Sequence, residues 1–365
     1  MQLSRKVTPS NQMSDKEYRE LKDRLSYSAF KQYVNSRSKF YKEMILGEYV
    51  KRVSTEATIK GDMVHVLLAD QQGEWDSKFV MASGKIPTGQ MQTLVLELYN
   101  RSLRSMDAEG RQVDQFSVIL QDAINVVKYE ADGITEKAFK KKTNEWILEA
   151  FQKEGESYYQ ELLKSTGKDV ITMIQVETAE KLVTQLREHP YTRDIVNLQS
   201  TEEVEVFTEL VILYQIDNIK YRSMVDKLVV DHKNKTVTPW DYKTTWSPES
   251  GWEYSYLSNY YYIQVGLYDL ALKEWIKEHG LQDYKVLPMR YICIDTTGQA
   301  SPVIYVMQDK DVLLAQRGFT VRGRKYMGIN EIQKNIAWHL SSGDWTTTEI
   351  INKNNGQMMM DIVYR

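Results

Sequence analysis

The chain has 365 residues, of which 42% are hydrophobic, and its formal net charge at pH 7 is −3. A chain of this length can bury a large core, as one elaborated domain or as two. The single cysteine, Cys293, and the lack of a transmembrane-length apolar run or signal-peptide pattern favour a reducing, cytoplasmic setting without membrane contact.

The pattern along the chain predicts five segments. Residues 1–25 are polar with little periodicity and are expected to form a flexible N-terminal arm or a partly formed helix. The next four segments are the N-terminal part of a core at 26–70, a helical insertion at 71–200, the main part of the core at 201–345, and a C-terminal tail at 346–365.

Two helices are expected in the first part of the core. Ser26 is expected to cap a helical region rich in aromatic residues. Further along, Gly61 opens an apolar run that predicts a helix carrying His65. A lone histidine on an apolar helix is often a hydrogen-bonded core group, but histidine is also a common metal ligand. Both interpretations of His65 stay open at this point.

The insertion shows strong helical periodicity. Its helical stretches are predicted at 94–103, 116–127, 135–151, 157–163 and 171–189. None of its residues forms a convincing catalytic constellation. The segment is expected either to form part of the wall of a substrate channel or to be a structural cap.

A run of β-branched and apolar residues at 204–214 predicts a strand that feeds a hairpin. The hairpin consists of strands at 224–230 and 236–243, with a charged turn between them. Glu205 or Glu209 of the first strand could add a carboxylate to a site in the hairpin, although strand glutamates more often face solvent.

The hairpin brings Asp226 and Asp241 towards one point. Two converging carboxylates are costly to bury unless a cation lies between them, and their oxygens suit Mg²⁺ or Mn²⁺. Lys243 lies two residues after Asp241, so the period of a strand places both on the same side. There its ammonium can hold an attacking water and offset phosphate charge. The side chain of Tyr242 then points away, and its backbone carbonyl is a further candidate metal ligand.

The context of Asp241-Tyr242-Lys243 distinguishes it from the Asp-x-Lys sequences that begin at Asp76 and Asp231, which fall in a predicted loop and turn. Pro239 interrupts the strand that carries Asp241, and proline cannot donate to a β ladder. A bulge just before Asp241 is therefore expected.

Helical spacing recurs at 256–277, where Gln264 and Tyr268 are four residues apart and hence lie on one face of the helix. Further strands are predicted at 286–294 and 303–306, followed by one helix from about residue 310 to residue 340.

The order of these motifs resembles the RecB-like branch of the PD-(D/E)XK nuclease superfamily, which includes RecE-type phage exonucleases. The resemblance implies an α/β fold, with a restriction-endonuclease-like core in which helices flank a central mixed β-sheet, plus the helical insertion. The matching motifs are the start of the helix at Ser26, Gly61-x-x-x-His65, Asp226, Asp241-x-Lys243 and Gln264-x-x-x-Tyr268.

The resemblance also implies a role for each motif residue. Mg²⁺ or Mn²⁺ would be held by His65, Asp226, Asp241 and the Tyr242 carbonyl, the water would be positioned by Lys243, and Gln264 and Tyr268 would contact DNA or brace the centre. Some relatives hold an iron–sulfur cluster on four cysteines, and the single cysteine here excludes one.

The implied function is that of a metal-dependent DNA exonuclease acting on ends of linear, double-stranded DNA in recombination, repair or phage DNA metabolism, in a bacterial or phage-infected cell. A single-strand annealing or recombination protein and a second copy of the chain are expected partners. The alternatives are an endonuclease on the same core, a catalytically silent DNA-binding or recombination scaffold, and a hydrolase of another phosphoester.

The slightly acidic net charge does not exclude DNA, because the local field rather than the total charge steers it. Two basic stretches are candidate DNA-binding surfaces, and solvated faces are the alternative for both. The first includes Lys140, Lys141 and Lys142, and the second includes Arg322 and Arg324.

Overall fold

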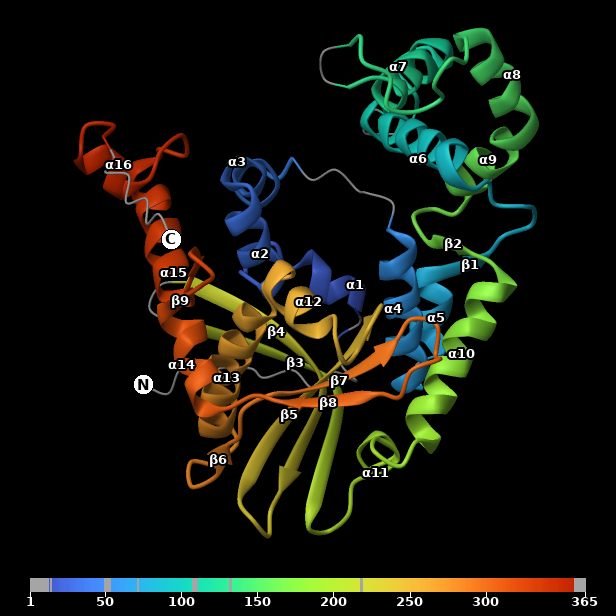
Figure 1. Cartoon of the computed structure of the whole chain (residues 1–365). Coiled ribbons are helices and arrows are strands. Elements are labelled where there is room, and N and C mark those ends of the chain that lie inside the picture. Colours follow the sequence, from blue (N-terminus) through green and yellow to red (C-terminus); the bar gives the residue numbers. More distant parts are fainter. Residues whose placement is uncertain are drawn as a thin grey trace. The chain divides into compact units, whose positions relative to one another are not determined.

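The structure is a computed structural model, and it describes residue 13 and residues 15–48, 54–70, 72–106, 111–130, 133–216 and 219–357. The chain forms two compact units (Figure 1). The first comprises Met1–Glu48 and Leu182–Arg365, and the second comprises Tyr49–Lys181. Residues 1–12 of the predicted N-terminal arm and residues 358–365 of the predicted tail lie outside the described residues. Within the described ranges, no helix is long and apolar enough to cross a membrane.

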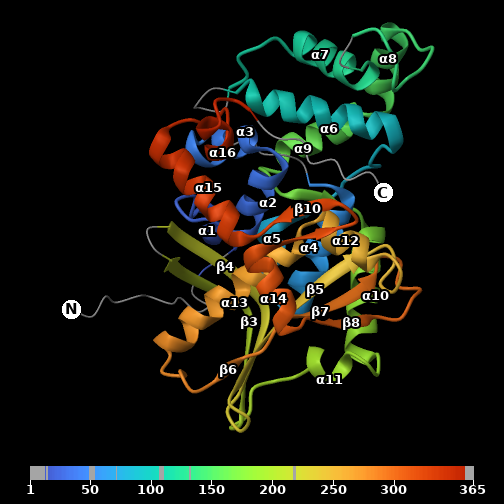
Figure 2. The same cartoon turned by 60° about the vertical axis from the view of Figure 1, so that its left-hand side comes forward.

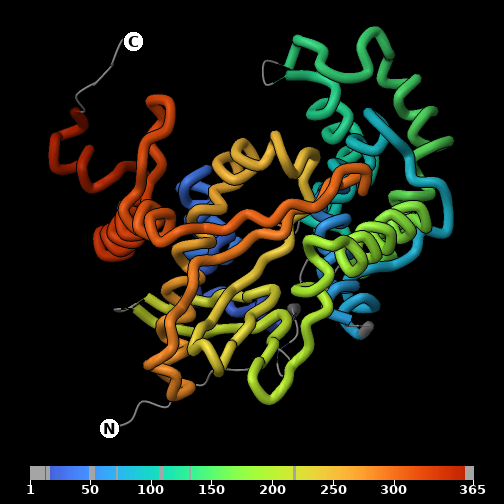
Figure 3. The backbone as a smooth tube through the Cα atoms, turned by 60° about the horizontal axis from the view of Figure 1, so that its bottom comes forward, coloured from blue at the N-terminus to red at the C-terminus, as the bar shows by residue number. Residues whose placement is uncertain are grey.

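A mixed β-sheet forms the centre of the first unit, and helices flank it, so the predicted α/β fold is confirmed. The order of its main strands is β3-β4-β5-β7-β8, and β6 also pairs with β5. The strands are β3 (Val204–Ile216), β4 (Ile219–Asp231), β5 (Thr236–Thr245), β6 (Lys285–Val286), β7 (Arg290–Asp295) and β8 (Val303–Val306). Strands β3, β4 and β5 are antiparallel neighbours, whereas β5 pairs in parallel with β7. In Figure 3 the orange trace of β7 and β8 runs beside the yellow trace of β5.

The bulge expected before Asp241 is absent from the ladder between β4 and β5. Pro239 pairs with Leu228 in an uninterrupted register. The irregularity lies on the other side of β5. There, three residues, 287–289, separate β6 from β7, whereas only two residues of β5, Thr238 and Pro239, lie opposite them. Because proline has no N–H to donate, the break in pairing falls where the missing donor would have been needed.

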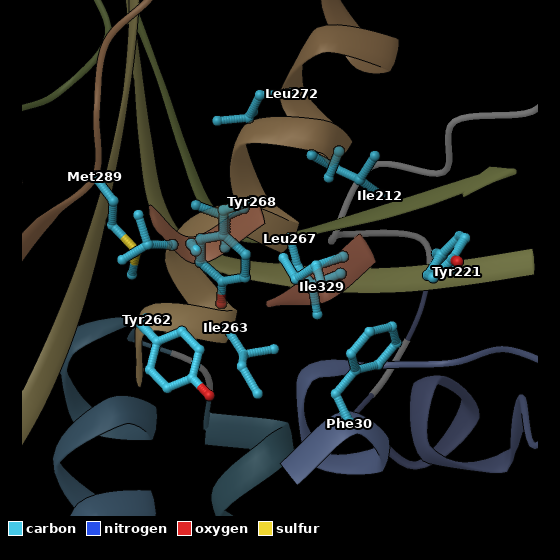
Figure 4. Close-up of a cluster of buried hydrophobic side chains, with 14 of the residues drawn as sticks. Phe30, Ile212, Tyr221, Tyr262, Ile263, Leu267, Tyr268, Leu272, Met289 and Ile329 are labelled. Carbon is cyan, nitrogen blue, oxygen red and sulfur yellow. The ribbon is translucent and has the colours of Figure 1, made fainter. Parts of the chain in front are cut away.

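Helix α13 (Tyr261–Glu278) packs against the face of the sheet formed by β3, β4 and β6. Figure 4 shows the apolar cluster that this packing buries, including Leu267 of α13, Ile212 of β3 and Tyr221 of β4. Three further helices surround α13 in the same unit: α2 (Tyr27–Asn35), α14 (Asp309–Arg317) and α15 (Ile329–Ser342).

The N-terminal segment is fixed to strands and helices much later in the chain. Leu25 forms a parallel bridge with Tyr221 at the start of β4. On α2, the Tyr33 hydroxyl lies 3.0 Å from Nε2 of His339 on α15. The His339 Nδ1 donates to the Asp344 carbonyl at 2.6 Å, so Nε2 is the acceptor for Tyr33. Short elements accompany these helices: α1 (Asp15–Glu20), α3 (Arg37–Phe40), a π-helix (Tyr41–Ile45) and α16 (Glu349–Lys353).

The single helix predicted from residue 310 to residue 340 is wrong. A hairpin of β9 (Gly318–Val321) and β10 (Arg324–Met327) separates α14 from α15. Gly318 has φ +84°, and a Cβ there would lie 2.7 Å from the carbonyl oxygen of Tyr326. The backbone therefore turns out of the helix at a position that requires glycine. The helix predicted at 256–277 is likewise two helices, α12 (Trp252–Ser258) and α13, because Tyr260 adopts a left-handed conformation.

The second unit is mainly helical, and Figure 2 shows α6, α7, α8 and α9 together. Its core includes Leu94, Ile124 and Phe151. The helix predicted at 135–151 begins only at Asn144, because Thr143 caps it. The elements of this part are α4 (Glu56–Leu68), α5 (Gln72–Lys78), β1 (Phe79–Met81), α6 (Gly89–Arg104), α7 (Phe116–Lys128), α8 (Asn144–Glu154), α9 (Glu156–Lys164), β2 (Asp169–Ile171) and α10 (Met173–Glu188), which leads back into the first unit.

Candidate active site

Asp226 on β4 and Asp241 on β5 lie where these two strands separate. The ladder between the strands ends at the pair Lys227–Trp240. Beyond it, β4 continues in pairing with β3, and β5 continues in pairing with β7. The carboxylate of Asp226 fills the opening, where its Oδ2 accepts a hydrogen bond of 2.9 Å from the backbone N–H of Tyr242. Asp241 is fully buried and Asp226 is 8% exposed, so the sheet holds two carboxylates away from solvent at this point.

Lys243 lies on the same side of β5 as Asp241, as the period of the strand predicts. Its Nζ contacts Oδ2 of Asp241. The ammonium also lies 5.2 Å from the ring centre of Tyr261 and 5.9 Å from that of Tyr291. Burial alone would lower the pKa of Lys243, but the charges of Asp241 and then Asp226 outweigh burial and raise it. The two carboxylates therefore favour the charged form of Lys243 in this arrangement.

Gln264 and Tyr268 on α13 hold the second oxygen of Asp241. The Gln264 Nε2 donates to Asp241 Oδ1 at 2.5 Å and lies 3.0 Å from the Tyr268 hydroxyl. The Tyr268 hydroxyl donates to the backbone carbonyl of Met224 on β4. Burial, followed by the charge of Asp241, raises the pKa of Tyr268 well above its usual value, so the hydroxyl stays protonated. This arrangement fits the bracing role considered for both residues.

Glu209 on β3 lies beside Asp226. The β3–β4 register places it between the pairs Thr208–Lys227 and Leu210–Val225, directly opposite Asp226. Carboxylate oxygens of Glu209 and Asp226 lie within 4.8 Å of each other. Glu209 has φ +52°, a left-handed conformation that costs a non-glycine residue about 1–2 kcal/mol. A strained residue of this kind is often found at a functional site.

The strain at Glu209 comes with a change in which face of the strands is buried. Phe207 and Leu210, three residues apart on β3, both pack in the core below α13. Val225 and Leu228 on β4 do the same. Because side chains of a regular strand alternate, a spacing of three means that both strands change phase at Glu209 and Asp226. The sequence carries this signal in the spacing of its apolar residues at 207, 210, 212 and 214.

The family model of the PD-(D/E)XK nuclease superfamily matches residues 24–333. The chain belongs to this superfamily. No curated protein matches the chain. Among solved structures, a crystal structure of a protein from Eubacterium rectale, provisionally named as an exonuclease, is similar at 10% identity and a TM-score of 0.44, and the similarity covers 100% of this chain and 97% of that chain. Assignment to the RecB-like or RecE-type branch stays a prediction.

PD-(D/E)XK nucleases use divalent metal ions, and the donors at the strand opening fit such an ion. The carboxylates of Asp226, Asp241 and Glu209 and the carbonyl of Tyr242 all offer oxygen, which Mg²⁺ and Mn²⁺ prefer. His65 lies on α4 of the second unit, and its part in the metal centre stays a prediction.

Glu205, the other glutamate considered on β3, lies closer to the turn than Glu209. Its Oε2 is 3.5 Å from Nε2 of His232, which follows β4 directly. Tyr291 of β7, which the sequence analysis did not identify, also lies beside the residues of the candidate site. Parallel pairing places Tyr291 beside Asp241, and its hydroxyl lies 3.5 Å from Oε1 of Gln264.

The residues predicted to bind DNA occupy two surfaces, one in each unit. In the second unit, Lys140, Lys141 and Lys142 are exposed and immediately precede α8. In the first unit, Arg322 and Arg324 lie on the β9–β10 hairpin and are also exposed. Their contact with DNA stays a prediction.

Proposed function

We propose that the protein is a metal-dependent exonuclease that hydrolyses the phosphodiester bonds of linear DNA from an end. The observation that supports the nuclease chemistry most strongly is the convergence of Asp226, Asp241 and Lys243 where β4 and β5 separate. Two buried carboxylates beside a lysine ammonium would provide a place for a metal ion and for a phosphate.

Each residue has a separate task in this proposal. Asp226 and Asp241, with the Tyr242 carbonyl, would hold Mg²⁺ or Mn²⁺, and we include His65 and Glu209 as further ligands. When bound, the ion supplies a Lewis acid for the phosphate and lowers the pKa of a coordinated water. No covalent intermediate with the protein is required.

Lys243 would orient the attacking water and offset negative charge that develops on the phosphate. In the structure its ammonium contacts Oδ2 of Asp241, while Gln264 occupies Oδ1. Asp241 would therefore share its carboxylate between Lys243 and a bound ion. Lys243 would then turn towards the phosphate, while Gln264 keeps Asp241 in position.

The exonuclease part of the proposal rests on the order of the motifs, which resembles that of end-processing RecB-like nucleases. An end-dependent nuclease needs a channel that admits a strand and a basic lining that grips phosphates, without a base-reading module. A role in recombination, repair or phage DNA metabolism, an annealing partner and self-association remain predictions from the same resemblance.

The experiment is incubation of the purified chain with end-labelled linear duplex DNA and with relaxed closed circular DNA, in Mg²⁺ and in EDTA. Asp241→Asn, purified in parallel, is the control for a contaminating nuclease. We expect the wild type in Mg²⁺ to remove the end label from linear DNA and to leave the closed circle intact. Neither EDTA samples nor Asp241→Asn should remove the label. Linearisation of the circle would replace the proposal with an endonuclease. No cleavage of either substrate, with Mn²⁺ also tried, would contradict a nuclease.

A further inference from the structure

Lys31 on α2 is a second lysine near the α12–α13 junction that borders the site, outside the motifs considered so far. Its Nζ donates to Oδ1 of Asn259 at 2.9 Å. Asn259 ends α12, one residue before the left-handed Tyr260 that leads into α13. The Tyr27 hydroxyl, one helical turn before Lys31, donates to the carbonyl of the same Asn259 at 2.5 Å. Helix α2 is thus held against the junction between α12 and α13.

The same junction also carries the aromatic contact of Lys243. Tyr261, two residues after Asn259, lies 6.2 Å from the ring of Tyr27 and 5.2 Å from the Lys243 ammonium. Tyr261 is therefore the common neighbour of Tyr27 on α2 and of Lys243 on β5. Lys31 and Lys243 are thus linked through the same α12–α13 junction, and all of these residues belong to the first unit.

The electrostatic surroundings of the two ammonium groups differ. Lys243 contacts the carboxylate of Asp241, whereas Lys31 is half-buried with a neutral amide as its hydrogen-bond partner. Within the described residues, no carboxylate forms an ion pair with Lys31. Burial, and then the charge of Lys243, lowers the pKa of Lys31. A half-buried cation near a second cation is unfavourable unless an anion binds close to it and offsets the repulsion.

We propose that Lys31 binds a backbone phosphate of the nucleic acid, next to the phosphate that is cleaved at Lys243. The ligand class follows from chemistry: the anion has to reach a half-buried ammonium beside the scissile phosphate, and a polynucleotide carries a negative charge on each neighbouring linkage. This inference rests on the proposed function. It adds a binding residue from α2, a helix that contributes neither a metal ligand nor the Lys243 cation.

The rival role for Lys31 is structural, since its hydrogen bond with Asn259 could simply tie α2 to the α12–α13 junction. Loss of this structural hydrogen bond would lower the melting temperature and would weaken the binding of all DNA probes equally. A phosphate contact has a different signature, because the effect of losing Lys31 then depends on whether one particular phosphate is charged.

The test measures binding of short fluorescent DNA in EDTA, where cleavage is not expected, to the full chain and to Lys31→Met. The probes are one unmodified strand and a set of strands that each carry a single neutral methylphosphonate linkage. The control variant is Lys273→Met, which removes an exposed lysine whose ammonium pairs with Asp269 at 2.7 Å, further along α13. Lys31→Arg tests whether a retained charge restores binding.

We expect Lys31→Met to weaken binding of the unmodified strand about tenfold, because a hydrogen bond to a charged group is lost. The slope of log affinity against log salt should fall by about 0.7 for a single strand. On the one probe whose neutral linkage replaces the contacted phosphate, the wild type should also bind about tenfold more weakly. On that same probe, Lys31→Met should bind less than about twofold more weakly than the wild type. Lys31→Arg should recover most of the loss, and Lys273→Met should bind like the wild type.

Equal losses on every probe, with a lowered melting temperature, would assign Lys31 the structural role and overturn the phosphate contact. Unchanged binding in Lys31→Met would overturn it as well. Either result leaves the proposed nuclease intact if the wild type cleaves DNA in Mg²⁺. Conversely, a wild type that fails to cleave contradicts the proposed function, while the methylphosphonate result still decides whether Lys31 contacts a phosphate.

Discussion

Gln264 donates a hydrogen bond of 2.5 Å from its side-chain amide to Oδ1 of Asp241, and so ties helix α13 to the deepest carboxylate of the site. The orientation of the amide follows from its neighbours, because the carboxylate oxygen of Asp241 can only accept and therefore requires the amide nitrogen on that side. Asp241 is thus held by an uncharged donor, and this contact does not neutralise the negative charge that would attract a metal ion.

This relationship predicts the effect of replacing Gln264. Gln264→Leu removes a hydrogen bond to a charged group, and with it about 1.5–3 kcal/mol of the interaction free energy that holds Asp241 in position. We expect the cleavage rate on linear DNA to fall at least tenfold, with a weaker response to Mg²⁺. Tyr268→Phe, which keeps the ring and the direct contact between Gln264 and Asp241, should retain more activity than Gln264→Leu. The reverse order of the two variants in single-turnover rates would contradict the bracing role of Gln264.

A second prediction concerns the buried pair of Lys243 and Asp241. Lys243→Met should lower the cleavage rate more than tenfold, and Lys243→Arg should not restore it, since a planar fork replaces a compact charge. In EDTA, Lys243→Met and Asp241→Asn should each lower the free energy of unfolding by up to about 3 kcal/mol, because each leaves its partner buried without its counter-charge. The double variant should lose less than the sum, as urea denaturation can measure. Additive losses would show that the two groups do not interact.

Glu209 gives a prediction in which stability and metal binding change in opposite directions. Glu209→Gly removes the cost of a left-handed backbone and should raise the free energy of unfolding by up to about 1 kcal/mol. Metal affinity, measured by calorimetric titration with Mn²⁺, should fall at the same time. Glu209→Gln keeps the backbone cost and should lower affinity without gaining stability. Full affinity in both variants would exclude Glu209 from the metal centre.

The fourth prediction concerns Lys227, whose Nζ donates to the carbonyls of Val196 and Leu198 at 2.9 Å and 3.2 Å, where helix α11 (Arg193–Val196) ends. Burial lowers the pKa of Lys227 to about 8. Below that pH both folded and unfolded chains carry the proton, and the cost of burying the charge is fully present.

Between pH 8 and the unfolded pKa of about 10.4, the unfolded chain binds more protons than the folded one. The contribution of Lys227 to the free energy of unfolding therefore rises with pH across this window. Lys227→Met should remove that rise, as urea denaturation at pH 7 and pH 9.5 can show. The exposed Lys233, replaced by methionine, is the control. A rise of the same size in Lys227→Met would refute the prediction.

The last prediction concerns the basic stretch before α8. Replacing Lys140, Lys141 and Lys142 together by glutamine should shorten the tract digested per binding event, because fewer phosphates are held. Cleavage of short oligonucleotides should remain nearly unchanged. Product lengths after a single encounter, at two salt concentrations, measure the effect. Equal tract lengths would assign the three lysines to a solvated face.

The parts of the site that were predictable from sequence obey local rules. Asp241 and Lys243 are two residues apart on a strand, and Gln264 and Tyr268 are four apart on a helix, so spacing alone orients each pair. A tight hairpin then brings Asp226 alongside, as the register of β4 and β5 confirms up to Lys227.

The remainder depends on pairing between distant strands or on signals that the composition of a segment does not reveal. Tyr291 reaches the site through parallel pairing of β5 with β7, across a connection that includes α12 and α13. Glu209 differs from Glu205 by the change of strand phase, a signal that the spacing of apolar residues carries but that β-branched composition, on which the strand was predicted, does not reveal. The hairpin between α14 and α15 also escaped prediction, because it depends on the turn that the chain makes at Gly318, which has φ +84°.

The bridge between Leu25 and Tyr221 and the contact between Tyr33 and His339 bear on the order in which the protein folds. A ribosome delivers α2 long before it delivers β4 or α15. During that interval the apolar face of α2, including Phe30, lacks the partners that later bury it. Contacts between segments so far apart in the sequence slow folding, and in the meantime apolar surface stays exposed to other molecules. We therefore expect fragments ending before β4 to leave α2 undocked, and a nascent chain of that length to be a client for chaperones.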